Sequence, residues 1–221
     1  MPDAPHHETH INYTALIPYT PYITSWSEER EPAAQLIEQP GRGIAYRDEV
    51  VTDRDSRGVL WYRASSRHGH GQPLFAKVHP LRQRRAMHRL LCNVCAKPAD
   101  QTDQGVLWLL RDFREDWPGW PERMGATEPP VCAPCVRVAS RLCPALRKGA
   151  VAVRVGHAPI AGVRGALYRS GSGLVPEPMG EITVAYEDPR IRWVRAMNLV
   201  RELLDCTIVS LDELCQNSTA A

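Results

Sequence analysis

Four of the seven cysteines stand in two closely spaced pairs, and they form the part of the sequence whose residue types could most readily do chemistry. Two residues separate Cys92 from Cys95, and two separate Cys132 from Cys135. This spacing lets both thiolates of a pair face one ion from a tight turn, and two such pairs complete a tetrahedral shell. Because four thiolates leave no position open to water, the sequence predicts one structural Zn²⁺ per chain.

The segment between the two pairs is long enough for a hairpin, with one strand predicted at 106–110. Over about residues 90–143 the sequence resembles the treble-clef class of zinc fingers, in which one cysteine pair lies on a turn called a knuckle and the other begins a helix. The resemblance implies that the first pair forms the knuckle and that the second begins a helix ending near Leu142. The knuckle departs from the usual pattern, because Ala96 stands where a glycine is expected. The class is too diverse to imply one function.

Other chemistries fit these cysteines less well. The second pair also fits a thioredoxin-type redox turn before a helix, although that hypothesis leaves the first pair unexplained. An HNH nuclease needs a histidine between the pairs, and none lies between Cys95 and Cys132. A zinc deaminase needs a glutamate where Lys97 stands, and Cys92 would close its open coordination position. With no phosphate-binding or nucleophile motif either, we expect a non-catalytic protein. An enzyme with a site of scattered residues remains an alternative.

A basic helix is predicted directly before the knuckle, from Pro80 to about Leu91. At 100° per residue, its apolar residues share one face, and its arginines are expected to project from the other. Arginines on one helical face can contact several phosphates or reach bases in a groove. The pattern therefore predicts a nucleic-acid-associated or regulatory protein that binds DNA or RNA. The predicted contacts are Arg82, Arg85, Arg89, Arg137 and Arg141.

Aromatic side chains suggest the alternative function, a protein-interaction or assembly module, because aromatic residues are enriched at interfaces. They gather in the N-terminal segment and in the loop Trp117–Pro121. The predicted partner contacts are Tyr19, Tyr22, Trp26, Trp117 and Trp120. For the loop we favour a role as a cap on the zinc lobe.

The composition is that of a folded globular chain, with 43% hydrophobic and 24% charged residues in 221. A net charge of +2 argues against a surface that binds polyanions over the whole protein, and leaves local basic patches. There is no apolar run of the roughly 20 residues that a membrane helix needs, and residues 1–10 lack a signal-peptide core. We therefore expect a cytoplasmic protein, in which paired cysteines favour metal over disulfides.

Periodicity and turn residues predict an α+β fold of small hairpin and helix domains organised around the zinc site. Three regions are expected. Residues 1–42 form an N-terminal extension, 43–149 hold a β-hairpin, the basic helix and the zinc lobe, and 150–221 hold strands and an amphipathic helix packed on the lobe as one unit.

Within these regions the predicted helices, besides the two at the cysteines, span 32–38 and 188–204. The second has Asp188 as its N-cap and Pro189 in its first turn. The predicted strands span 44–51 and 59–63, which form the hairpin, and 151–155, 163–169 and 182–186.

Overall fold

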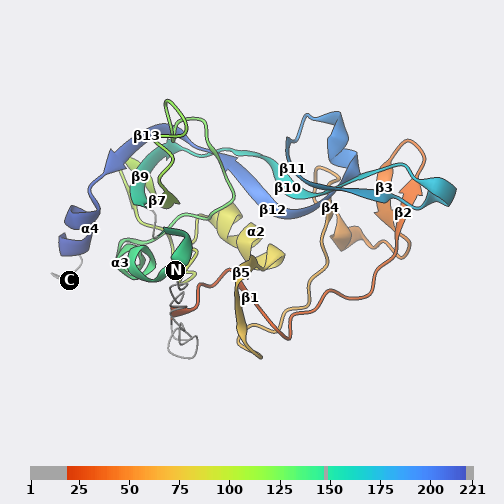
Figure 1. Ribbon diagram of the computed structural model, residues 1–221, viewed down its shortest axis with the longest axis horizontal. Helices are drawn as coiled ribbons and strands as arrows, with labels where there is room; N and C mark the ends of the chain where they lie inside the picture. Colours follow the sequence, from red (N-terminus) through yellow and green to blue (C-terminus); the bar gives the residue numbers. More distant parts are fainter. Residues whose placement is uncertain (1–18, 147–148, 218–221) are drawn as a thin grey trace, which may run out of the picture.

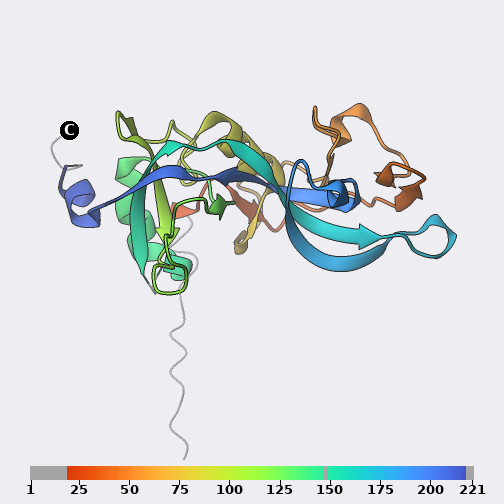
Figure 2. The same ribbon diagram turned by 90° about the horizontal axis from the view of Figure 1, so that it is seen from above.

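Two β-sheets share one long ribbon in the computed structural model, which describes residues 19–146 and 149–217. Strand β9 (Ala150–His157) is followed almost at once by β10 (Ile160–Arg169), and β12 (Val194–Glu202) by β13 (Leu204–Val209). β9 pairs with β13 and β10 with β12, both antiparallel. The ribbon runs along the long axis of the molecule and carries the other elements (Figures 1 and 2).

The first sheet has the order β13-β9-β7-β6, with β7 at Gly105–Arg111 and β6 at Gln101–Thr102. Side chains alternate between its faces. Val106, Trp108 and Leu110 of β7 face one core cluster, and Leu107 and Leu109 face another. Both faces are therefore covered, which explains the unbroken apolar run of β7. Helices α3 (Ala133–Leu142) and α4 (Leu211–Asn217) contact each other, and both contribute to the second cluster.

The second sheet has the order β11-β10-β12-β4, and the short strand β8 (Gly125–Ala126) also pairs with β12. β11 spans Glu177–Ala185, and β4 (Leu60–Trp61) lies parallel to β12. Helix α2 (Pro80–Arg89) packs against β12. The side chain of Gln83 exchanges hydrogen bonds with the backbone of Leu199, and Arg201 donates to the carbonyl of Met87 at the end of the helix.

Four short strands and four 3₁₀ turns complete the described chain. β1 (Thr24–Trp26) pairs with β5 (Pro73–Val78), and β2 (Leu36–Gln39) with β3 (Gly43–Tyr46). The 3₁₀ turns span Val51–Asp53, Pro144–Leu146, Ser172–Leu174 and Pro189–Trp193. No helix among the described residues is long and apolar enough to cross a membrane.

The mixture of helix and strand that the sequence predicted is confirmed, as are both helices next to the cysteines. The strands expected at 106–110, 151–155, 163–169 and 182–186 are also present, with longer bounds. Strands of the C-terminal region pair with β4, β7 and β8 of the middle region. The first 18 residues of the predicted N-terminal extension lie outside the described residues.

The helix predicted at 188–204 is wrong. Asp188 does cap a helical turn, because its side chain accepts a hydrogen bond from the backbone N–H of Arg190, but the turn ends at Trp193. From Val194 the chain is a strand between β10 and β4. Gly165 lets β10 approach β12 closely, since a Cβ at this position would lie 2.1 Å from the carbonyl oxygen of Arg195. Pairing with a distant strand therefore outweighs the helical spacing.

The helix at 32–38 and the hairpin of 44–51 with 59–63 are also wrong. Residues 36–39 form β2, which is the strand that pairs with β3, while β4 pairs with β12. The chain does turn at residues 55–58, but two charged residues of the expected turn, Asp53 and Arg54, form ion pairs with Arg63 and Glu49. Arg63 lies 2.6 Å from Asp53 and 3.0 Å from Asp48.

Candidate metal centre

The thiols of Cys92, Cys95, Cys132 and Cys135 meet at one point beside the first sheet. All four sulfur atoms lie within 4.8 Å of one another, and the sulfurs of Cys95 and Cys132 are 3.6 Å apart. Cys92 is fully buried, Cys132 and Cys135 are half-buried, and Cys95 is exposed. The four cysteines could therefore hold one metal ion at the edge of the core.

The first pair lies on a tight turn directly after α2. The helix ends at Leu90, which has a left-handed backbone (φ 49°). The turn is closed by hydrogen bonds from the N–H of Cys92 to the carbonyl of Lys97 (2.7 Å) and from the N–H of Ala96 to the carbonyl of Cys92 (3.0 Å). Ala96 takes φ 60°, a conformation that favours glycine. The turn thus forms without its usual glycine, at the expense of local backbone strain.

The second pair lies at the start of α3. Cys132 is the N-cap residue, and Pro134 stands in the first turn, where its missing N–H is not needed. The backbone before the helix is tied to β7, because the N–H of Val131 donates to the carbonyl of Leu107. The N–H of Asn93 donates to the carbonyl of Pro130 and so joins the two cysteine segments directly.

Apolar side chains enclose the inner side of the cluster. Cys92 shares a core cluster with Leu107 and Leu109 of β7, Val136 of α3 and Ala152 of β9. The sheet thus fixes the position of the most buried thiol, while Cys95 lies toward solvent.

The electrostatics of the thiols fit a cation. Hydrogen bonds, chiefly from Cys132 and then from Cys135, lower the pKa of the Cys92 thiol to about 2. The pKa of Cys135 is raised, because its thiol donates to Cys132 and Cys92 and is partly desolvated. Without a cation, these close thiols share protons, since adjacent thiolates would repel one another. A divalent ion would replace those protons, and all four sulfurs could then ligate it as thiolates.

The N-terminal segment passes over the knuckle. The N–H of Tyr22 donates to the carbonyl of Val94 (2.9 Å), and that of Ile23 to the carbonyl of Asn93 (3.3 Å). A few residues later the same segment buries a carboxylate, that of Glu29, against α2. Its oxygens lie 2.6 Å from both terminal nitrogens of Arg82 and 3.6 Å from Nε2 of His79.

The arginines predicted to contact nucleic acid do not form one outward face. The prediction that Arg82 projects outward is wrong, since only 7% of its side chain is exposed. Arg82 lies one turn before Ala86 and hence at the edge of the buried face, and Glu29 draws it inward. Arg85 and Arg89 are exposed on α2. On α3, Arg141 is exposed and Arg137 is half-buried.

The aromatic residues predicted to bind a partner differ in their exposure to solvent. Trp26 and Trp120 are buried, with 7% and 5% of their surface exposed, whereas Tyr19 and Trp117 remain 51% and 42% exposed. Tyr22 is half-buried. Trp120 packs with Trp108 and Val153 on the face of the first sheet that lies away from the cysteines. The loop Trp117–Pro121 therefore covers the zinc lobe on the face of β7 that lies away from the cysteines, so the expected cap is confirmed for Trp120.

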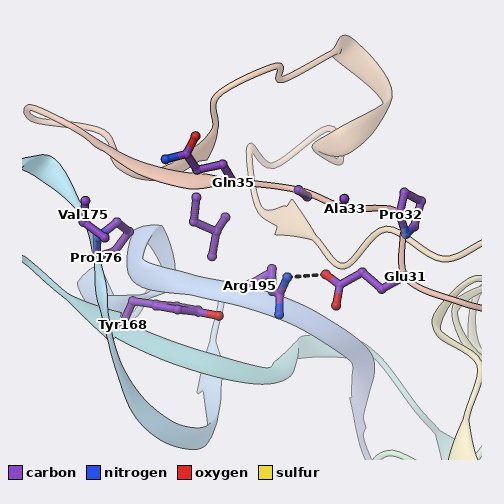
Figure 3. Close-up of a pocket in the computed structure, with 10 residues that line it drawn as sticks. Glu31, Pro32, Ala33, Gln35, Tyr168, Val175, Pro176 and Arg195 are labelled. Carbon is purple, nitrogen blue, oxygen red and sulfur yellow. Dashed lines mark hydrogen bonds and ion pairs between the residues drawn. The ribbon is translucent and has the colours of Figure 1, made fainter.

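Away from the cysteines, at the far end of the ribbon, lies a hollow with a volume of about 500 Å³. Figure 3 shows Arg195 of β12 pointing toward Glu31 across it, with Tyr168 and Pro176 on the other side. The guanidinium of Arg195 donates to Glu31 at 2.5 Å and lies over the ring of Tyr62, 4.7 Å from its centroid. Sequence reasoning missed Glu31, Glu29 and Gln83, because the partners of each lie far away along the chain.

No protein-family model, no curated protein and no solved structure matches this chain.

Proposed function

We propose that this chain is a non-catalytic zinc-binding protein whose metal is structural, and that it associates with nucleic acid. The observation that carries the metal assignment is the convergence of four thiols, two on a tight turn and two at a helix start, within 4.8 Å. Four sulfur ligands in a tetrahedral arrangement are typical of structural zinc, and they leave no position for water or substrate. Cys92, Cys95, Cys132 and Cys135 would hold the ion.

The ion would link parts of the chain that are otherwise joined by few bonds. The knuckle carries the end of α2 and accepts the N-terminal segment, while α3 packs on β7 and α4. Zinc would therefore fix α2 and its exposed arginines relative to the first sheet.

Metal analysis of the purified chain tests this assignment. We expect about one zinc per chain by mass spectrometry of acid-released metal. Cys135→Ser should remove most of it. The matched control is Cys206→Ser, which changes a half-buried cysteine that packs on the opposite face of the sheet. Full-length protein prepared without chelator and free of zinc would contradict the assignment.

Nucleic-acid association is supported by the charge of α2. This helix has no acidic residue, and its exposed side includes Arg85 and Arg89. Exposed arginines on one side of a helix can contact successive phosphates. Fluorescence anisotropy with labelled DNA and RNA at low salt tests this part, with Arg85→Ala/Arg89→Ala as the variant. We expect weaker binding and a shallower dependence on salt, by roughly 0.7–0.9 in log–log slope for each phosphate that the variant no longer binds.

A protein-interaction module remains the second candidate, favoured by exposed apolar side chains at the turn between β10 and β11. Leu174, Val175 and Met179 are each 54–55% exposed, and Val175 lines the hollow of Figure 3. Such a cluster on a surface is typical of a contact site. Pull-down from the native cell, with and without nuclease, separates the candidates. A partner protein that resists nuclease and no longer binds Leu174→Ser/Met179→Ser would favour this one.

A further inference from the structure

The arginines on the described surface fall into two groups. Many are held by a carboxylate, as in the ion pairs Arg114–Asp112, Arg169–Glu177 and Arg190–Asp188 at 2.6–2.7 Å. Arg57 and Arg84 differ, because no carboxylate in residues 19–146 or 149–217 forms an ion pair with either. Each lies against an aromatic ring. Cζ of Arg57 is 4.2 Å from the centroid of Tyr186, and Cζ of Arg84 is 4.4 Å from that of Trp61.

The two arginine–aromatic pairs belong to one surface. The carboxylate of Asp55 accepts a hydrogen bond from the indole N–H of Trp61 at 3.0 Å. Burial and then the charge of Asp55 raise the pKa of Tyr186, while the charges of Arg57 and Arg84 lower it, so all three charged groups act on the same phenol. His88 is exposed one turn after Arg84. We call this set the α2–Tyr186 surface: Asp55, Arg57, Arg84, His88 and Tyr186, with the buried Trp61 beneath Arg84.

The charge of this surface favours an anionic ligand. Asp55 is engaged by its own loop, since it also accepts from the N–H groups of Arg57 and Val59. The exposed Arg85 and Arg89 flank the surface on α2 and likewise form no ion pair with a described carboxylate. Asp55 thus stands beside four arginines, and the net charge of these five side chains is positive.

The geometry favours a ligand with flat rings as well as negative charge. A guanidinium held against an aromatic ring keeps its other face free, and nucleic-acid bases stack on such planes and on aromatic rings. In a duplex the faces of the bases are already stacked on one another. In a single strand they are free to bind.

We propose that the α2–Tyr186 surface binds single-stranded nucleic acid, with bases stacked on the guanidinium groups of Arg57 and Arg84 and phosphates contacted by Arg85 and Arg89. This inference rests on the nucleic-acid association proposed above. It adds the strandedness of the ligand and two residues, Arg57 and Arg84, whose role is stacking.

The test compares full-length variants by anisotropy with three probes: an oligothymidylate, an oligouridylate and a DNA duplex. Arg57→Lys/Arg84→Lys keeps the charge but removes the planar group. We expect this variant to bind both single strands more weakly, by roughly 5- to 150-fold for each base that no longer stacks, with little change for the duplex. Arg85→Ala/Arg89→Ala should weaken binding to every probe and flatten the salt dependence.

Two controls keep the result interpretable. Arg169→Ala removes an ion-paired surface arginine and should bind like the parent chain. Thermal unfolding of each variant shows whether the fold survives, and the lysine side chains still cover Trp61 and Tyr186 with their stems.

Equal affinity for single strands and duplex, together with no effect of Arg57→Lys/Arg84→Lys, would overturn the inference and leave nucleic-acid association standing. No binding to any probe at low salt would overturn both. Preference for the single strands that disappears in the lysine variant would support both.

Discussion

The cysteine cluster and the Glu29 cluster are two polar groups at the edge of the core that the same N-terminal segment contacts, and their side chains are stabilised in different ways. Around Glu29 the charges are complementary. The carboxylate accepts from the guanidinium of Arg82 and from the N–H of Trp26, and Arg82 also donates to the carbonyl of Thr24. The four thiols are chemically alike and offer one another no such complement. The Glu29 cluster therefore balances its main charges within the chain, although Nε of Arg82 and Nδ1 of His79 find no hydrogen-bond partner among the described residues. The four thiols could instead hold a cation.

This difference predicts which conditions break each region. Removing metal should loosen the knuckle and α3 and leave the Glu29 cluster intact. Low pH, or the substitution Arg82→Ala, should release the N-terminal segment from α2 and leave the four cysteines in place.

The largest expected effect comes from the metal. Cys135→Ser, or a strong chelator, should destabilise the chain by on the order of 5 kcal/mol or more, because the free energy of zinc binding is part of the free energy of folding. Chemical denaturation followed by tryptophan fluorescence measures this loss. Added zinc should restore the chelated parent chain but not the variant. Equal unfolding midpoints for parent, chelated and variant protein would show that the cluster holds no structural ion.

The next effect comes from the ion pair. Arg82→Ala leaves the carboxylate of Glu29, whose side chain is 0% exposed, without its main partner. Breaking a buried pair in this way costs about 3–5 kcal/mol. Arg169→Ala, at an exposed pair, should cost less than about 1 kcal/mol. Zinc content should be unchanged in both. A loss of zinc from Arg82→Ala would show that the two regions are coupled more tightly than their separate bonding suggests.

Acid provides a smaller and graded test of the same cluster. Burial lowers the pKa of His79 below 6.5, so the folded state prefers the neutral ring, and stability present above pH 6.5 is lost as pH falls. For Glu29, burial opposes ionisation, but hydrogen bonds from Arg82 and Trp26 outweigh it and lower the pKa below 4.5. Its contribution is therefore lost only in more acidic solution.

The free energy of unfolding should accordingly start to fall near pH 6.5, and less steeply in His79→Gln, whose side chain does not titrate. Denaturant titrations over a pH series measure both slopes. Because parent and variant share the same zinc ligands, acid release of metal affects both and cancels in the comparison. Parallel slopes would show that His79 does not cause the loss of stability near pH 6.5.

The two regions also differ in how much of them the sequence could predict. The four-cysteine cluster is encoded in two short motifs, so the spacing within each pair and the helix-compatible segment after Cys132 were sufficient to predict that these thiols converge and that α3 follows. The partner of Arg82 lies 53 residues earlier, in a segment with no recognisable pattern. Helical spacing alone placed Arg82 beside Arg85 and Arg89, because nothing local reveals a distant carboxylate.

The same limit explains the error at β12. Residues 188–204 carry a proper N-cap and helical spacing, and both are local signals. What decides the structure is a ladder with β10, a short parallel pairing with β4 and the docking of Gln83 on Leu199. These contacts join residues that are at least 27 positions apart (Leu167 and Val194), and they leave no periodic trace in the strand itself.

The smallest effect concerns the one place where the knuckle departs from its usual sequence. Ala96 is held at φ 60° by the hydrogen bond from its N–H to Cys92 and by the bond from Cys92 to Lys97. A left-handed backbone costs a non-glycine residue about 1–2 kcal/mol. Ala96→Gly removes that strain but adds about 0.4–1 kcal/mol of entropy to the unfolded chain. The net gain should therefore lie between about 0 and 1.6 kcal/mol, measured as a higher denaturant midpoint with an unchanged slope. In the chelated protein the gain should shrink, because without the ion the turn need not keep this conformation. A substitution that destabilises the zinc-loaded chain would mean that the methyl group of Ala96 contributes packing that outweighs its strained backbone.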